Sequence, residues 1–281
     1  MNMKYVFFGT PDFAAIILEK LIKAGWLPTA VVCNPDKPVG RKRIITPPPT
    51  KVIALKNGIK AYQPEKLEIP ACAGRENLKL EIGEIDFAIV VAYAKIIPKE
   101  ILGLPRLGTV AVHPSLLPKY RGSSPIQTAI LDGEKETGVT LFLADEKVDH
   151  GKILAVSRLP LEVKDNYESL SKKLAESGGV LLVEILPKYL KNEITPLTQD
   201  ESQATYTKKF VTQDGYVDLE KDKPEIIEKK VRALNPEPGV WTLRQAQGRP
   251  QRMKILEAEL MPENKLRLKK IQFEGKKPQR I

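Results

Sequence analysis

Apolar and polar positions alternate along the first two thirds of the chain in the rhythm of strands and amphipathic helices. Short apolar runs bounded by Gly, Pro or polar residues predict strands at 5–8, 29–33, 87–92, 109–113 and 139–143. Apolar positions at helical spacing predict helices over 13–24 and 167–190. The run 87–92 is continuously apolar, as a strand buried on both faces requires. This order of elements predicts an α/β domain built on a mostly parallel, doubly wound sheet.

A second, smaller domain is expected after the first. Residues 191–206 are polar and are interpreted as a linker between a first domain, 1–190, and a second domain, 207–281. A helix is predicted over 226–234, a polar loop over 244–252, and short strands at 241–243, 253–256 and 266–273. No last element is expected over 276–281, so the second domain is predicted to be a small β-rich barrel that is short of a strand.

The chain is basic, and its excess of positive charge is concentrated near the end. The 281 residues include 45 Lys or Arg against 35 Asp or Glu, and residues 207–281 alone hold 18 against 11. Such a segment favours a polyanionic partner, of which nucleic acid is the commonest. A solubilising surface explains the charge equally well.

Membrane, disulfide-rich and zinc-binding classes are disfavoured. No apolar run is long enough for a membrane-spanning helix or for the core of a secretory signal. Cys33 and Cys72 are the only cysteines, lie far apart and form no CxxC motif, which favours a reducing cytoplasm. The histidines, His113 and His150, do not combine with them in the spacing of a zinc site, so no metal is expected.

A long basic segment at 34–51 contains five prolines and the cluster Arg41-Lys42-Arg43. Loops of this length inside an α/β domain are typically functional or disordered. Proline stiffens such a segment, and the basic cluster can contact phosphates. We expect an RNA-contacting loop, with a solvated insertion as the alternative.

Two titratable residues follow predicted strands. His113 ends the strand at 109–113, at the edge where open α/β sheets place their ligands, and Asp149 lies just beyond the next strand. A carboxylate that reaches back to this histidine would orient the ring. An Asp in a β-turn before Gly151 is the structural alternative. Because side chains alternate along a strand, Ala111 is the neighbour of His113 on the same face.

These motifs together resemble methionyl-tRNA formyltransferases. The resemblance rests on GTPDF at 9–13, NPDKPVGRKR at 34–43, VVAYAKIIP at 90–98, VHPSLLPKYRGSSPIQ at 112–127, ETGVTLF at 136–142 and VDHG at 148–151. SLLPKYRG marks the wider folate-dependent formyltransferase superfamily. The basic loop, TYTKK at 205–209 and Leu234-Asn235-Pro236 point to the tRNA enzymes.

The resemblance implies a Rossmann-like N-terminal domain, a C-terminal domain resembling an OB barrel, and formyl transfer from 10-formyltetrahydrofolate to the α-amine of methionyl initiator tRNA. It implies a cytoplasmic monomer with no metal and no membrane partner. Its catalytic residues fall on His113 and Asp149. Its folate contacts fall on Phe87, Val91, Ala92, Tyr93, Ile96, Ser115, Leu116, Leu117, Pro118 and Asp145. Its tRNA contacts fall on Arg41, Lys42, Arg43, Lys208 and Lys209.

The family's third catalytic residue is an Asn, in the pattern Asn-Val-His, and this position is Ala111 here. A carboxamide would donate to the oxyanion of the tetrahedral intermediate, and losing one such donor typically costs about 10²–10³ in rate. The alternatives are an active enzyme in which another group or a water is the donor, a sugar-amine N-formyltransferase, and a non-catalytic tRNA-binding variant. The basic loop and basic C-terminal segment disfavour the sugar-amine enzyme.

Overall fold

The computed structural model describes residues 3–40, 42–67, 84–246 and 249–281. They form two compact units, neither of which is continuous in sequence. The first unit comprises the residues up to Arg121 together with 138–159 and 172–205. The second comprises 122–137, 160–171 and 206–281. Cys72 and Arg41 lie outside the described residues.

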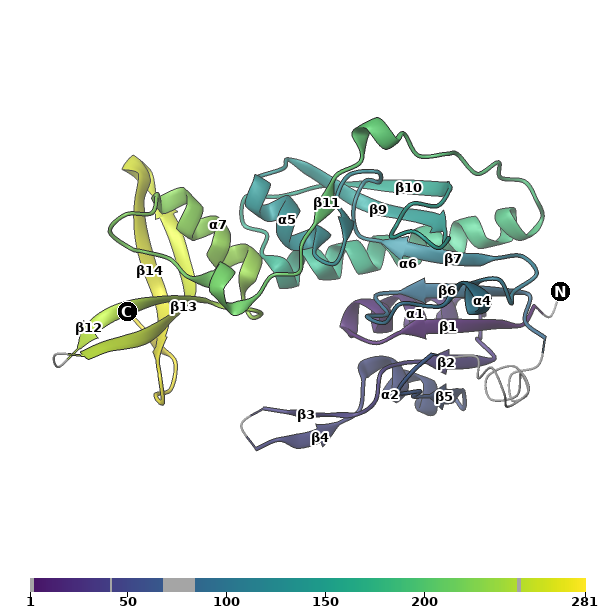
Figure 1. The fold of residues 1–281 in the computed structure, drawn as a ribbon, viewed down its shortest axis with the longest axis horizontal. Helices are drawn as coiled ribbons and strands as arrows, with labels where there is room; N and C mark the ends of the chain where they lie inside the picture. The colour runs from purple at the N-terminus through teal and green to yellow at the C-terminus, as the bar shows by residue number, and fades with distance from the viewer. Residues whose placement is uncertain (1–2, 41, 68–83, 247–248) are drawn as a thin grey trace. The chain divides into compact units, whose positions relative to one another are not determined.

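A seven-stranded sheet of order β10-β9-β7-β6-β1-β2-β5 forms the centre of the first unit (Figure 1). Its strands are β1 (Tyr5–Gly9), β2 (Ala30–Val32), β5 (Lys60–Tyr62), β6 (Phe87–Val91), β7 (Thr109–His113), β9 (Glu136–Leu143) and β10 (Ile153–Pro160). Strands β5, β2, β1, β6 and β7 pair in parallel, and β9 runs antiparallel to β7. The expected mostly parallel sheet is confirmed.

Helices cover both faces of this sheet. They are α1 (Asp12–Lys23), α2 (Pro49–Lys56), α4 (Lys99–Leu102) and α6 (Tyr167–Leu190). Helix α6 approaches one face so closely that a Cβ on its Gly178 would lie 3.3 Å from Val112 and 3.5 Å from Ile17 of α1. Because Val112 points toward α6, its neighbours Ala111 and His113 point to the opposite face.

The opposite face is covered by the short helix α4. Its Ile101 packs with Val6 and Phe8 of β1 and with Ala88 of β6. Helices on both faces make the sheet doubly wound, as expected. Among the residues that the structure describes, no helix is long and apolar enough to cross a membrane.

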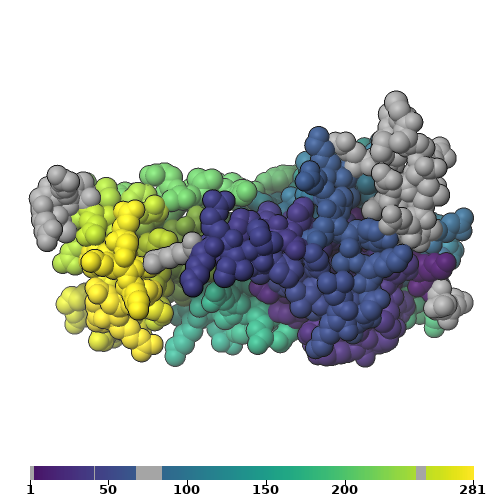
Figure 2. All heavy atoms as spheres, turned by 90° about the horizontal axis from the view of Figure 1, so that it is seen from below, coloured from purple at the N-terminus to yellow at the C-terminus, as the bar shows by residue number. Residues whose placement is uncertain are grey.

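The segment 34–51 is not the irregular loop that we expected. It contains an antiparallel hairpin of β3 (Lys37–Val39) and β4 (Ile44–Thr46), and α2 begins at Pro49. Gly40 has a positive φ of 72°, which suits a reversing turn. Proline at the first position of α2 costs no hydrogen bond, so the proline run starts a helix. The hairpin projects from the carboxyl end of β2, and its indigo residues reach the molecular surface (Figures 1 and 2).

The second unit is an antiparallel sheet of order β12-β13-β14-β15 packed against a helix. Its elements are α5 (Pro125–Asp132), β11 (Tyr206–Thr207), α7 (Pro224–Leu234), β12 (Val240–Ala246), β13 (Arg249–Met261), β14 (Lys265–Phe273) and β15 (Gln279–Arg280), together with Gly122 of the two-residue strand β8 (Arg121–Gly122). Strand β8 pairs with β11 in a separate two-stranded sheet. The apolar side of the main sheet includes Val240, Ile255 and Ile271, and α7 buries Ile227 and Val231.

Two expectations for the second unit were wrong. The polar segment 244–252 extends two strands, because Ala246 pairs with Arg249 across a hairpin. Residues 279–280 form the edge strand β15, where Gln279 pairs with Ile271. Polar side chains predict a loop poorly here, because the end of a hairpin and an edge strand need no apolar alternation.

Candidate active site

His113 is the last residue of β7, and its side chain lies on the sheet face away from α6. The ring is buried, with Nε2 2.8 Å from the carbonyl oxygen of Tyr120 and Nδ1 3.5 Å from Oδ2 of Asp149. A carbonyl oxygen can only accept a hydrogen bond, so Nε2 carries a proton. The other nitrogen, Nδ1, then faces the carboxylate, and this pair can hold or pass a proton between them.

The structure brings Asp149 to His113 by a route that the sequence did not indicate. Because β9 runs antiparallel to β7, His113 pairs with Thr140, and Leu143 at the end of β9 pairs with Val110. The strand before Asp149 therefore ends beside the start of β7, and the loop 144–152 returns along the sheet to reach the histidine at the other end of β7. The sequence suggested that His113 and Asp149 follow strands that end at the same edge of the sheet. This expectation was wrong, because it assumed that β9 runs parallel to β7.

The loop that carries Asp149 adopts a strained turn. Asp149 itself has a positive φ of 48°, which is uncommon for a residue with a side chain. A Cβ on Gly151 would lie 1.7 Å from the carbonyl oxygen of Leu143, so only glycine fits that position. The amide of Gln199 donates to the carbonyls of Asp149 at 2.9 Å and of Gly151 at 2.8 Å. These contacts fix the direction of the Asp149 carboxylate.

We expect Gly151→Ala to destabilise the fold by about 2 kcal/mol or more, because backbone must move to admit the methyl group. Thermal unfolding, followed by circular dichroism, should show a melting temperature lowered by roughly 4–8 °C. Gly103→Ala is the matched control, since Gly103 has a φ of −88° and its Cβ would lie 3.4 Å from the carbonyl oxygen of Lys99. Equal shifts in the two variants would contradict the close approach at Gly151.

Arg121 is a fully buried side chain at the centre of the network that supports this loop. Its Nη2 donates to Oε1 of Gln199 at 2.7 Å, and both Nη atoms donate to the carboxylate of Glu201 at 2.7 and 3.0 Å. The hydrogen bonds from Arg121 hold the pKa of the Glu201 carboxyl below its usual range. His150 lies between two carboxylates, with Nδ1 2.6 Å from Asp145 and Nε2 3.6 Å from Glu201.

Sequence reasoning missed Arg121 and Gln199. The signal for Arg121 was its place in SLLPKYRG, where a charged residue follows a rigid loop. Nothing in the polar segment 191–206, which we interpreted as a linker, distinguishes Gln199 from its neighbours. In the structure residues 191–205 belong to the first unit, and Leu197 pairs with Ile153 of β10.

The folate residues expected at 91–96 begin with the last residue of β6, Val91, and continue just beyond it. Ala92 has a positive φ of 45°, and Ile96 is 92% exposed. Tyr93 is buried against Phe8, and burial raises the pKa of its hydroxyl to about 12. Among the described residues, neither its Oη nor Oδ1 of the buried Asn34, which follows β2, has a hydrogen-bond partner.

The other expected folate residues divide into two groups. Leu117 packs with Ala111, while the hydroxyl of Ser115 donates to the carbonyl of Lys119 at 2.6 Å, so the loop 115–118 borders the histidine face. Phe87 is not with them. It begins β6, at the opposite strand end, and its buried ring stacks on Tyr5 at 4.8 Å. The structure thus makes Phe87 a core residue, remote from the edge where β6 ends.

The four expected tRNA residues that the structure describes are exposed, two in each unit. Lys42 and Arg43 lie in the turn of the β3–β4 hairpin. Lys208 forms an ion pair with Asp214, and Lys209 is exposed beside it.

The base of the β3–β4 hairpin is anchored by a polar cluster. Nζ of Lys51 lies 2.9 Å from both carboxylate oxygens of Asp36, and Gln63 donates to the same carboxylate at 2.7 Å. These two donors hold the pKa of Asp36 below its usual range.

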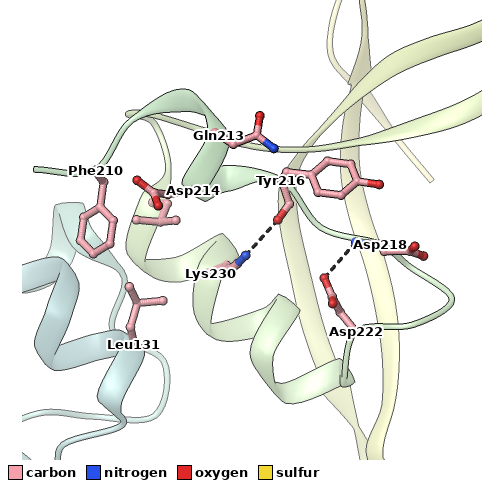
Figure 3. Close-up of a pocket in the computed structure, with 9 residues that line it drawn as sticks. Leu131, Phe210, Gln213, Asp214, Tyr216, Asp218, Asp222 and Lys230 are labelled. Carbon is pink, nitrogen blue, oxygen red and sulfur yellow. Dashed lines mark hydrogen bonds between the residues drawn. The ribbon is translucent and has the colours of Figure 1, made fainter. Parts of the chain in front are cut away.

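A separate hollow of about 430 Å³ lies in the second unit, between α5, α7 and the segment 210–222 (Figure 3). Its polar groups bind one another. Lys230 donates to the carbonyl of Tyr216, and Asp222 accepts from the amide of Asp218, both at 2.9 Å. None of the expected catalytic, folate-binding or tRNA-binding residues lines it. Within the described ranges, no group of three or more His, Cys, Asp or Glu side chains could hold a metal ion.

Comparison with known proteins gives a consistent family. Residues 3–186 match the family model described as formyl transferase, and residues 209–266 match that of the formyl transferase C-terminal domain. A methionyl-tRNA formyltransferase of Halalkalibacterium halodurans is 43% identical over 92% of this chain and 78% of its own length. One from Staphylococcus aureus strain MW2 is 39% identical over 94% of this chain and 81% of its own.

Solved structures share the fold at low sequence identity. The methionyl-tRNA formyltransferase from Clostridium thermocellum has a TM-score of 0.62 at 16% identity, covering 96% of this chain and 98% of that one. HypX from Aquifex aeolicus in complex with tetrahydrofolic acid has a TM-score of 0.66 at 17% identity, covering 99% of this chain and 45% of that one.

Proposed function

Because the chain belongs to the methionyl-tRNA formyltransferase family, we propose that His113 and Asp149 are the catalytic pair of its formyl transfer. The enzyme moves a formyl group from a folate-derived donor to methionyl initiator tRNA. One observation carries the assignment of the pair, namely the 3.5 Å between Nδ1 of a buried histidine and a carboxylate oxygen.

The two side chains suit different parts of the reaction. Attack of the α-amine on the formyl carbon forms a C–N bond and leaves a proton on the attacking nitrogen. The Asp149 carboxylate is 22% exposed and the His113 ring 7%, so the carboxylate is the group that the amine reaches first. It takes the proton, and Nδ1 of His113 holds it until the folate nitrogen leaves and needs one. The Tyr120 carbonyl keeps Nε2 protonated and the ring in place.

We propose 10-formyltetrahydrofolate as the donor, bound at the ends of β6 and β7. The contacting set is Val91, Ala92, Tyr93, Ile96, Ser115, Leu116, Leu117, Pro118 and Asp145. The buried Tyr93 hydroxyl supports this, because its lack of a partner among the described residues is costly unless a bound molecule supplies one.

The assignment is tested with one donor and two acceptors. Purified enzyme with 10-formyltetrahydrofolate should formylate methionyl initiator tRNA and leave a nucleotide-linked amino sugar unchanged. Formylation of the sugar amine in preference to the tRNA would contradict the proposed substrate.

We expect the double substitution Lys42→Ala with Arg43→Ala to weaken tRNA binding and to leave folate binding nearly unchanged. Both side chains are exposed in the hairpin turn, where they can contact phosphates. The slope of log K against log salt should become shallower by about one unit for each phosphate that the variant no longer neutralises. Binding of initiator tRNA at several salt concentrations measures this.

Lys56→Ala with Lys60→Ala is the matched control, because these exposed lysines lie outside the hairpin. An unchanged affinity and salt slope in the hairpin variant would identify the hairpin as a solvated insertion.

A further inference from the structure

Two loops support the catalytic pair, and a third segment binds both of these loops. The loop 114–121 supplies the Tyr120 carbonyl that holds His113, and the loop 144–152 supplies Asp149. The segment 199–205 contacts the first loop through Thr205. Its hydroxyl accepts from the amide of Tyr120, and its carbonyl accepts from the amide of Arg121, both at 2.8 Å.

The same segment contacts the second loop through Gln199. This side chain is buried, and both ends of its amide are used. Its oxygen accepts from Nε of Arg121 at 3.1 Å and from Nη2 at 2.7 Å, and its nitrogen donates to the carbonyls of Asp149 and Gly151. A guanidinium group can only donate, so Arg121 turns the oxygen toward itself and the NH₂ toward the loop.

We propose that Gln199 is a positioning residue that, oriented by Arg121, holds the turn from which Asp149 reaches His113. This inference rests on the proposed catalytic role of the pair. The turn needs such support because Asp149 has a positive φ and the loop returns from an antiparallel strand. Two carbonyls of the loop, at 149 and 151, bind one side chain that lies about 50 residues further along the chain.

The decisive variant is Gln199→Glu. A glutamate has the same size and still accepts from Arg121, but it offers oxygen where the two carbonyls need donors. The turn should relax and move the carboxylate away from Nδ1. Gln203→Glu is the matched control, because it is the same substitution at an exposed position of the same segment.

Two measurements test the inference. Single-turnover formyl transfer should be about 10- to 100-fold slower in Gln199→Glu, with KM for both substrates within about threefold, since misplacement of a reacting group affects rate more than binding. The ¹⁵N resonance of His113 Nδ1 should also shift, while Gln203→Glu leaves rate and resonance unchanged. The chain has two histidines, so a His150→Gln spectrum assigns the signal.

The resonance does not depend on activity, so it separates this inference from the proposed function. If the unaltered enzyme transfers no formyl group, the proposed function fails, and the spectrum still decides whether Gln199 positions the pair. Gln199→Met provides a second variant without a buried charge, should the glutamate impair folding. A His113 resonance that is unchanged in a folded Gln199 variant would overturn the proposal, as would an unchanged transfer rate.

Discussion

Ala111→Asn is expected to raise the rate of formyl transfer by about 10²–10³-fold, with a smaller change in KM. Residue 111 precedes His113 by two positions on β7, so the two side chains share one face of the sheet. Ala111 is 7% exposed and packs with Leu117 and Phe142. An asparagine there would bring an NH₂ donor beside the reacting carbon, where the oxyanion develops.

Single-turnover kinetics at saturating folate measure the gain, with thermal unfolding as a check on the fold. Ala111→Asp is the matched control, because aspartate has the shape of asparagine but an ionised carboxylate accepts hydrogen bonds and cannot donate to an oxyanion. The control should show no gain. If the Ala111→Asn rate stays within threefold of the unaltered rate, an ordered water or another group already supplies the donor and residue 111 is not the missing one.

The parts of the fold that local pattern determines could be predicted closely. The strand 109–113 and the helix 167–190 have the bounds we expected. The strand is rich in β-branched residues, and the helix has apolar residues at helical spacing. The direction of a strand within the sheet could not be predicted in this way. Nothing local shows that β9 opposes β7, since its strand pattern reads the same in either direction.

The candidate site shows the same division. His113 was found from its place at a strand end, whereas Arg121 and Gln199 lie 78 residues apart and meet only in the folded chain. Phe87 was expected to contact folate, because an apolar run does not show which end of its strand faces a ligand. Its position at the start of β6 puts it at the strand end away from His113, against Tyr5.

His113→Gln and Asp149→Asn are each expected to lower the transfer rate by about 10²–10⁴-fold, the range typical of a general acid–base residue. Both substitutions keep the approximate shape of the side chain, so the fold should be preserved. The double variant should be little slower than the slower single variant, because one proton passes between Nδ1 and the carboxylate and either loss interrupts it.

A double-mutant cycle of single-turnover rates measures this coupling. Glu146→Gln is the control for Asp149→Asn, since it also converts a carboxylate to an amide in the loop 144–152, and Glu146 is an exposed residue that pairs with Lys99. The control should keep its rate within threefold. If the losses of the two single variants multiplied in the double variant, His113 and Asp149 would be acting on separate steps, and the transfer of a proton between them would be excluded.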